Sequence, residues 1–201
     1  MFFSELFLAV STFLVGVRAA SLSTNLVPLD TVGAVAAIQI PSNPTRIFYQ
    51  SFSGGIHQLC IDGTFTTGGL TCGPDNAPSV PPDEVAYGSP IVAVTFDALP
   101  SNSSRFSEFR IYYFSNENIL SEFIFTPGNP RHGDACPECI THRGFAVVPG
   151  SFLYAMANPT KPGNRVRVGF RSAGSPTTIT EAVLNGNTNT WSLTVLPDPP
   201  A

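Results

Sequence analysis

Charge is scarce in this sequence, and positive charge is the scarcer kind. Only 12% of the 201 residues are charged, Asp and Glu outnumber Lys and Arg by 14 to 10, and Lys161 is the only lysine. No nucleic-acid partner is expected, because phosphate binding needs a basic surface. An intrinsically disordered chain is excluded, because such chains carry more charge and fewer aromatic residues than the 16 Phe, 5 Tyr and 1 Trp present here.

The N-terminal apolar run is too short to span a bilayer, which takes about 20 residues. It extends from Leu6 to Val17, has 12 residues, and is followed by small residues. This pattern is typical of a secretory signal peptide cleaved after Ala19, although an N-terminal membrane anchor is the alternative. We therefore expect a signal peptide at 1–19, a single domain at 20–201, and a secreted, extracellular protein without a membrane span. A sequon at Asn102 fits an exported glycoprotein.

Cysteine is limited to four residues, an even number that suits disulfide bonds in an oxidising compartment. Cys60 and Cys72 could face each other across a hairpin, and Cys136 and Cys139 could close a small loop, but the connectivity stays open. A zinc site at the second pair is the alternative, which would need the histidines at positions 132 and 142 as further ligands. We expect a structural disulfide there, and no metal or other cofactor.

Three segments of the sequence repeat one pattern. An arginine opens an apolar strand, a polar turn follows, and a second apolar strand carries Gln or Glu after 12, 12 and 14 residues. A further short apolar stretch precedes and follows each segment, so four short strands are expected per unit. The turns are expected at 51–55, 115–118 and 171–178, and the preceding strands at 34–40, 90–96 and 152–157. The following strands are expected around 64–70, near 141–148 or just before it, and at 190–196.

Repeated units of four short antiparallel strands are typical of the blades of a β-propeller. We therefore predict an all-β chain of about three four-stranded antiparallel blades, which is a partial propeller. Because strand side chains alternate between faces, a tight turn makes the Arg and the Glu of one unit cross-strand neighbours, directly opposite or nearly so. These pairs are expected to project into the groove between adjacent blades.

An arginine beside a carboxylate offers hydrogen-bond donors next to acceptor oxygens, which matches the vicinal hydroxyls of a sugar. An aromatic residue commonly stacks on the apolar face of the sugar ring, and Trp191 follows the third repeat. The alternative is a salt bridge that only helps to fix the strand register and contributes about 0–1 kcal/mol. Recurrence of the pair in successive units favours a binding role.

The string from Arg110 to Phe123, with Asn-Ile-Leu-Ser-Glu-Phe at its end, resembles the fungal fucose-specific lectins of the Aleuria type, as do 46–56 and 88–94. The resemblance spans about residues 33–196. It implies a six-bladed β-propeller that binds L-fucose between blades, through Arg and Glu of one blade and a stacked aromatic residue. The carbohydrate-binding residues that it implies here are Arg110, Glu122, Arg167, Glu181, Trp191, Arg46 and Gln58.

The chain departs from this family in three respects. Gln58 stands where the family has Glu, only Trp191 keeps the expected aromatic residue, and about three blades are expected where the family has six. A homodimer could complete the ring, and the alternatives are a half-ring with capped ends or a sequence that has lost its other half. The expected partners are fucosylated glycans or glycoproteins.

Three functions remain in competition. A non-enzymatic lectin is favoured. A secreted interaction protein that has lost sugar binding is second, and a glycoside hydrolase is third, because hydrolysis needs two carboxylates facing one site.

Overall fold

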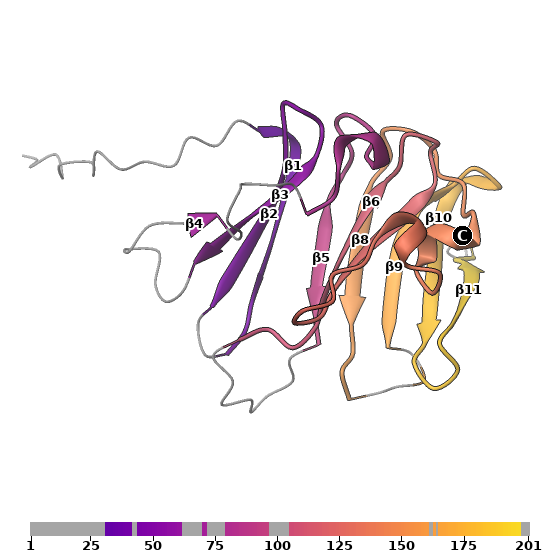
Figure 1. Ribbon diagram of the computed structural model, residues 1–201. Coiled ribbons are helices and arrows are strands. Elements are labelled where there is room, and N and C mark those ends of the chain that lie inside the picture. The colour runs from indigo at the N-terminus through magenta and orange to yellow at the C-terminus, as the bar shows by residue number, and fades with distance from the viewer. Residues whose placement is uncertain are drawn as a thin grey trace, which may run out of the picture.

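The computed structural model describes residues 31–41, 44–61, 70–71, 79–96, 105–160, 163 and 165–197. Its strands are β1 (Thr31–Gln39), β2 (Thr45–Ser51), β3 (Ile56–Ile61), β4 (Leu70–Thr71), β5 (Val92–Thr95), β6 (Phe109–Phe114), β7 (Leu120–Phe125), β8 (Leu153–Ala157), β9 (Val166–Ser172), β10 (Ser175–Asn185) and β11 (Thr190–Val195). They form three antiparallel sheets, ordered β1-β2-β3-β4, β5-β6-β7 and β11-β10-β9-β8, which lie side by side (Figure 1).

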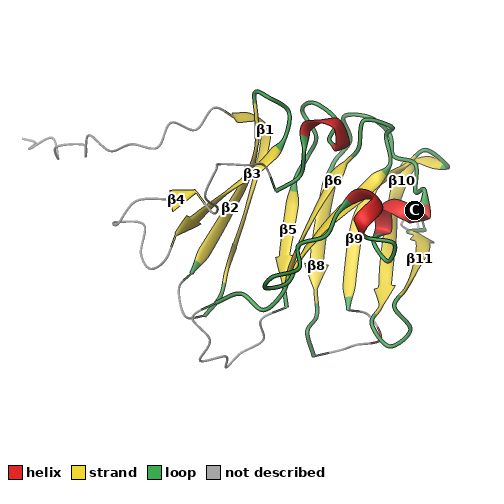
Figure 2. Cartoon of the chain, viewed as in Figure 1, coloured by secondary structure: helices red, strands yellow, loops and turns green. Residues whose placement is uncertain are grey.

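The predicted all-β class is confirmed. Within the described residues, the helical elements are the short 3-10 helices η2 (Pro82–Glu84), η3 (Gly133–Ala135) and η4 (Ile140–Arg143), which lie in the connections between strands (Figure 2), and Gly163 is also in 3-10 conformation. No helix in this part of the chain has the length and apolar character that crossing a bilayer requires.

Two apolar cores hold the sheets together, one on each face of the second sheet. All six residues of β6 are buried, because this strand is covered on both sides. Phe109, Ile111 and Tyr113 belong to the core shared with the first sheet. Tyr112 and Phe114 point to the opposite face, where they belong to the core shared with the third sheet. The two-residue period of a strand thus gives each blade two different interfaces.

The second unit has three strands, so the fourth strand expected at 141–148 is wrong. The chain forms η4 there, which ends at Gly144 in the left-handed conformation with a φ of 65°. Beyond it, Ala146 and Val147 make only isolated bridges. At this edge of β7, a side chain provides the hydrogen-bond partner that a fourth strand would have provided. The backbone N–H of Glu122 donates to the Thr141 hydroxyl, 3.0 Å away.

The long turn expected at 171–178 is also wrong. β9 continues to Ser172, and β10 already begins at Ser175. The register shifts between Ser175 and Thr180, so an irregularity within the strand absorbs the two extra residues of the third repeat.

The disulfide expected in the CxxC pair is confirmed between Cys136 and Cys139. Both cysteines are fully buried against Ile124 of β7. Cys60 is also disulfide-bonded, and Cys72 lies outside the described residues. The zinc alternative for the CxxC pair is wrong, since these two thiols are joined to each other. Among the described residues, no group of His, Cys, Asp and Glu is placed to hold a metal ion. The predicted signal peptide and the sequon at 102–104 lie outside the described residues.

Candidate functional site

The arginine and the Gln or Glu of each repeat occupy equivalent positions in the three sheets. In the second sheet Glu122 lies opposite Tyr112, two residues beyond Arg110. In the third sheet Glu181 lies opposite Gly169, again two residues beyond the arginine. The side chains therefore share one face and meet along the diagonal, which long side chains can bridge. The expected neighbourhood of the two groups is confirmed for the second and third units.

The pair of the second unit is buried between the second and third sheets. Arg110 Nη1 donates to Glu122 Oε1 at 2.9 Å, and the Tyr112 hydroxyl donates to the same oxygen at 2.9 Å. The backbone N–H of Ile140 donates to Glu122 Oε2 at 3.0 Å. Arg110 is 6% exposed and Glu122 is 0% exposed. Every carboxylate oxygen at this position already has a protein donor.

A second carboxylate extends this network towards the beginning of β6. Glu108 accepts from Arg110 Nε at 2.9 Å and from Arg165 Nη2 at 2.5 Å. Both guanidinium groups lie over the ring of Phe96, 5.2 and 4.3 Å from its centroid. Two arginines and two carboxylates thus form one connected cluster, stacked on an aromatic ring that desolvates it.

Burial dominates the electrostatics of this cluster. It raises the pKa of Glu122, and the Arg110 guanidinium opposes that rise by stabilising the anion. It also raises the pKa of Tyr112, so that this hydroxyl remains a donor. Burial by itself would lower the pKa of Arg110, but the surrounding Tyr112, Glu122 and Glu108 outweigh it and the pKa is raised. Arg110 therefore stays charged.

The expectation that Arg110 and Glu122 open onto a groove is wrong in this structure. η4 and the third sheet cover the pair, and its hydrogen bonds are made within the protein. The sequence pattern predicts which side chains of one sheet are neighbours, but it does not predict which other segments of the chain cover them.

The pair of the third unit has the same hydrogen-bonding pattern on an exposed face. Arg167 donates to Glu181 Oε2 through Nε at 2.9 Å and through Nη2. The Tyr154 hydroxyl donates to Glu181 Oε1 at 2.8 Å. The side chain of Arg167 is 46% exposed, whereas that of Glu181 is 4% exposed. A ligand at this face can reach the guanidinium without moving a covering element.

A tyrosine completes both pairs, but it comes from different strands. In the second sheet the donor Tyr112 lies on β6, and the equivalent position on β9 is Gly169. The donor in the third sheet is Tyr154 on β8, which lies opposite Gly169. A Cβ on Gly169 would be 2.0 Å from Tyr154 Cζ, so the phenol ring occupies the space that the glycine leaves. Desolvation and the bond to Glu181 raise the pKa of Tyr154 to about 12.

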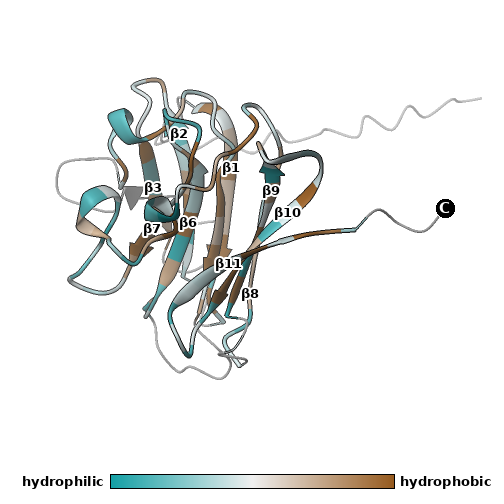
Figure 3. Cartoon of the chain, turned by 90° about the vertical axis from the view of Figure 1, so that its right-hand side faces the viewer, coloured by the Kyte–Doolittle hydropathy of each residue, from teal (hydrophilic) through white to brown (hydrophobic). Residues whose placement is uncertain are grey.

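Apolar side chains flank the exposed pair. The rings of Phe152 and Tyr154 are stacked, with centroids 6.3 Å apart and planes 8° from parallel. Phe152 is 42% exposed and Met156 is 46% exposed. In the view from this side of the molecule, the third sheet carries both hydrophilic and hydrophobic residues (Figure 3). An exposed aromatic surface beside a charged pair suits the two sides of a sugar ring.

Trp191 does not lie with the third pair. It lies opposite Leu184 on β10, three residues from Glu181, and therefore points to the other face of the sheet. There it packs in the core with the second sheet, where its ring meets Tyr112 edge-on at 6.2 Å. The expectation that Trp191 stacks beside Arg167 and Glu181 is wrong, because an odd number of residues along a strand reverses the face.

The first unit does not join its arginine to its glutamine acceptor. Arg46 donates to the Thr45 carbonyl at 3.0 Å and lies 5.1 Å from the centroid of Phe106. The side-chain oxygen of Gln58 is buried and has no hydrogen-bond partner within the described residues. The unit that has Gln58 in place of a glutamate therefore lacks the bonded pair that the other two units have.

Sequence reasoning missed the two tyrosines and the partners of Arg110. Tyr112 could have been found, because it lies on the same strand face as Arg110 at a spacing of two. Tyr154 could not, because its role depends on pairing with Gly169 across two strands. Glu108 and Arg165 are brought together from 57 residues apart by the packing of the sheets.

Comparison with solved structures identifies the fold. AofleA from Arthrobotrys oligospora superposes with a TM-score of 0.63 at 20% identity, over 86% of this chain and 44% of that one. Aleuria aurantia lectin in complex with Fucα1-6GlcNAc gives 0.60 at 22% identity, over 83% and 50%. A further structure of Aleuria aurantia lectin is described as a six-bladed β-propeller with a novel fucose recognition mode. The chain has the β-propeller fold of these lectins.

The predicted propeller and the resemblance to Aleuria-type lectins are thus confirmed at the level of the fold. The three sheets are propeller blades, and the chain spans about half the length of AofleA and of Aleuria aurantia lectin. No protein-family model and no curated protein matches the sequence.

Proposed function

We propose that this propeller chain is a carbohydrate-binding lectin that recognises L-fucose or fucosylated glycans, without catalysis. The observation that carries the proposal is the exposed group formed by Arg167, Glu181 and Tyr154 on the outer face of the third blade. The choice of fucose is based on the lectins of the same fold, because Aleuria aurantia lectin is described in complex with Fucα1-6GlcNAc.

The exposed group has the chemistry that a sugar requires. Arg167 uses two of its nitrogen atoms on Glu181 Oε2, and its remaining N–H groups, which have no other acceptor among the described residues, can donate to ring hydroxyls. Glu181 holds the guanidinium plane in place, which reduces the entropy lost when a ligand binds. The stacked rings of Phe152 and Tyr154 offer an apolar surface beside it. The buried pair of the second blade gives that blade structural support instead.

The proposal extends to assembly and location. A six-bladed ring needs about twice the number of blades seen here, and a homodimer about a two-fold axis would supply them and cover the exposed face of the third blade. The second copy would then close the fucose site from the other side. The N-terminal sequence supports secretion, where fucosylated glycoproteins are accessible partners.

The proposal is tested by titrating the purified protein with methyl α-L-fucoside in a calorimeter. Saturable binding that Arg167→Ala removes, and Arg171→Ala retains, is the expected result. Arg171 is the matched control because it lies on the same strand, is half-buried, and donates to the backbone carbonyl of Pro176. Absence of binding by the wild-type protein, as a dimer or as a monomer, would favour an interaction protein that has lost sugar recognition.

A further inference from the structure

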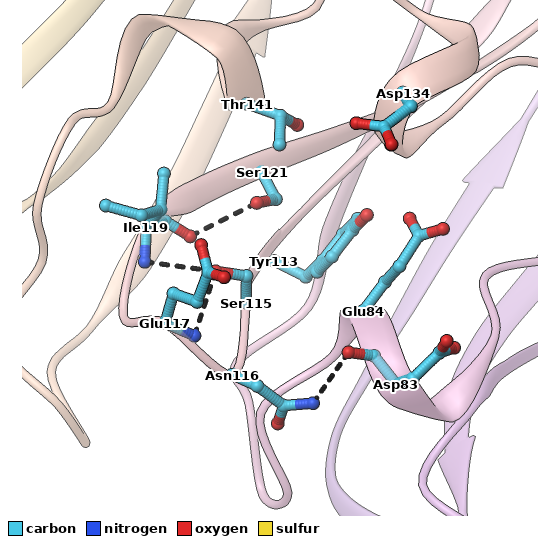
Figure 4. Close-up of a pocket in the computed structure, with 11 residues that line it drawn as sticks. Asp83, Glu84, Tyr113, Ser115, Asn116, Glu117, Ile119, Ser121, Asp134 and Thr141 are labelled. Carbon is cyan, nitrogen blue, oxygen red and sulfur yellow. Dashed lines mark hydrogen bonds between the residues drawn. The ribbon is translucent and has the colours of Figure 1, made fainter.

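A pocket lies on the face of the second blade opposite to the buried Arg110–Glu122 pair. It has a volume of about 260 Å³ and is formed by η2, by the turn between β6 and β7, and by η3 and η4 (Figure 4). The turn is fixed to η2, because the Asn116 side-chain amide donates to the Asp83 carbonyl at 2.9 Å. Ligand pockets for drug-sized molecules are about 300–1,000 Å³, so this cavity suits one small ring or one side chain.

The lining of this pocket is strongly acidic. It contains the carboxylates of Asp83, Glu84, Glu117 and Asp134, and neither lysine nor arginine lines it. His132 Nδ1 lies 2.9 Å from Glu84. The other three carboxylates have no ion-pair partner among the described residues. Unpaired carboxylates around one cavity create a negative potential that favours a cation.

A buried side chain whose hydroxyl reaches the cavity provides an independent sign of a ligand. Tyr113 is 1% exposed and lines the pocket. Its hydroxyl is directed into the space between Thr141, Asp134 and Glu84 (Figure 4), and it has no hydrogen-bond partner within the described residues. Desolvation, with a smaller contribution from Glu84, raises the pKa of Tyr113, so the group is a neutral phenol. The open cavity is therefore where this hydroxyl can meet a partner, and a bound polar group could donate to it or accept from it.

The lining distinguishes an organic cation from a metal ion. The described His, Cys, Asp and Glu residues form no group placed to hold a metal. Hydroxyls lie among the carboxylates instead: those of Ser115, Ser121 and Thr141, besides Tyr113. Ser115 Oγ accepts from the backbone N–H of Glu117 and of Ile119, which leaves its own hydrogen free to donate. Carboxylates match an ammonium group, and hydroxyls match the hydroxyls of a sugar ring.

We propose that this pocket binds a protonated amino sugar, with the ammonium group held by the carboxylate of Glu117 and a ring hydroxyl held by Tyr113. The pocket is separate from the proposed fucose site. Tyr113 faces the first blade, whereas Arg167 and Glu181 lie on the outer face of the third blade. A single chain would then recognise a neutral deoxy sugar and a cationic sugar at different places.

The test is a titration of the full chain with glucosamine, at a pH at which its amine is protonated, followed by NMR or calorimetry. N-acetylglucosamine is the neutral control, and Nα-acetyl-lysine amide and CaCl₂ are the competing cations. Binding of glucosamine, with N-acetylglucosamine at least about tenfold weaker, is expected from the loss of one charge-assisted hydrogen bond. Binding of only the lysine derivative or only calcium, or no binding at all, would overturn the proposal.

Variants distinguish binding of glucosamine in the pocket from non-specific attraction of a cation to the protein surface. Tyr113→Phe and Glu117→Gln should each weaken glucosamine binding about tenfold or more while leaving methyl α-L-fucoside binding unchanged. The matched controls are Tyr87→Phe, at a tyrosine that is 66% exposed, and Glu138→Gln, at a carboxylate paired with Arg131 outside the pocket. Equal losses in the pocket variants and the control variants would show that glucosamine binds elsewhere. The fucoside titration keeps this outcome distinct from a failure of the lectin proposal.

Discussion

Two arginines at equivalent positions of successive blades should have opposite roles, and their alanine variants test this directly. Arg110 is 6% exposed and is bonded to a fully buried carboxylate that also accepts from Tyr112 and Ile140. Removing one partner of such a pair leaves an uncompensated buried charge and costs about 3–5 kcal/mol. The side chain of Arg167 is 46% exposed, so Arg167→Ala should cost no more than about 1 kcal/mol.

Equilibrium urea unfolding measures both effects. With a slope of about 2 kcal/mol per molar urea, the expected loss moves the midpoint of Arg110→Ala down by about 1.5–2.5 M. Arg167→Ala should stay within about 0.5 M of the wild type. Fluorescence of Trp191 reports the transition, because its ring contacts Tyr112 beside the buried pair.

The two variants should differ in the opposite way in ligand binding. Arg167→Ala is expected to lose methyl α-L-fucoside binding, whereas the folded fraction of Arg110→Ala should retain it. If Arg110→Ala does not fold, Arg110→Lys keeps the charge and allows the same comparison. We argue that the third blade, which covers Arg110, determines whether the arginine is structural or binds a ligand, and that its position in the repeat does not. Equal stabilities of the two alanine variants would refute this argument.

Three further predictions concern the third blade and the disulfide. Gly169→Ala should displace the Tyr154 ring, since the new Cβ would lie 2.0 Å from it, and should destabilise the fold by about 1–3 kcal/mol in the same urea assay. Glu181→Gln should lower the pKa of Tyr154 from about 12 towards its ordinary value of 10, measured by ultraviolet titration. In the wild type, the stabilisation from this bond is complete below pH 10 and is lost as the pH rises through 12. Replacing Cys136 and Cys139 by Ser should cost about 2 kcal/mol by loop entropy, and an unchanged urea midpoint would contradict it.

The repeats in the sequence largely predicted the strands and the pairing within each blade. The arginine, the turn and the Glu lie on neighbouring antiparallel strands, where the two-residue period and the turn length fix which side chains share a face. The joined pairs Arg110–Glu122 and Arg167–Glu181 follow from this local geometry. The missing fourth strand of the second blade does not, because it depends on η4 bonding to the side chain and backbone of Glu122.

By itself, the sequence determined the all-β class, the three units, and the two Arg–Glu pairs, because these depend on residues that are close along the chain. Only the tertiary structure decided that Arg110 and Glu122 are buried, that Arg167 is exposed, and that Trp191 points to the second blade. Alternation along a strand specifies two faces, but not which neighbouring blade covers each of them. Burial depends on that contact between distant segments, and it separates a structural ion pair from a group that can meet a ligand.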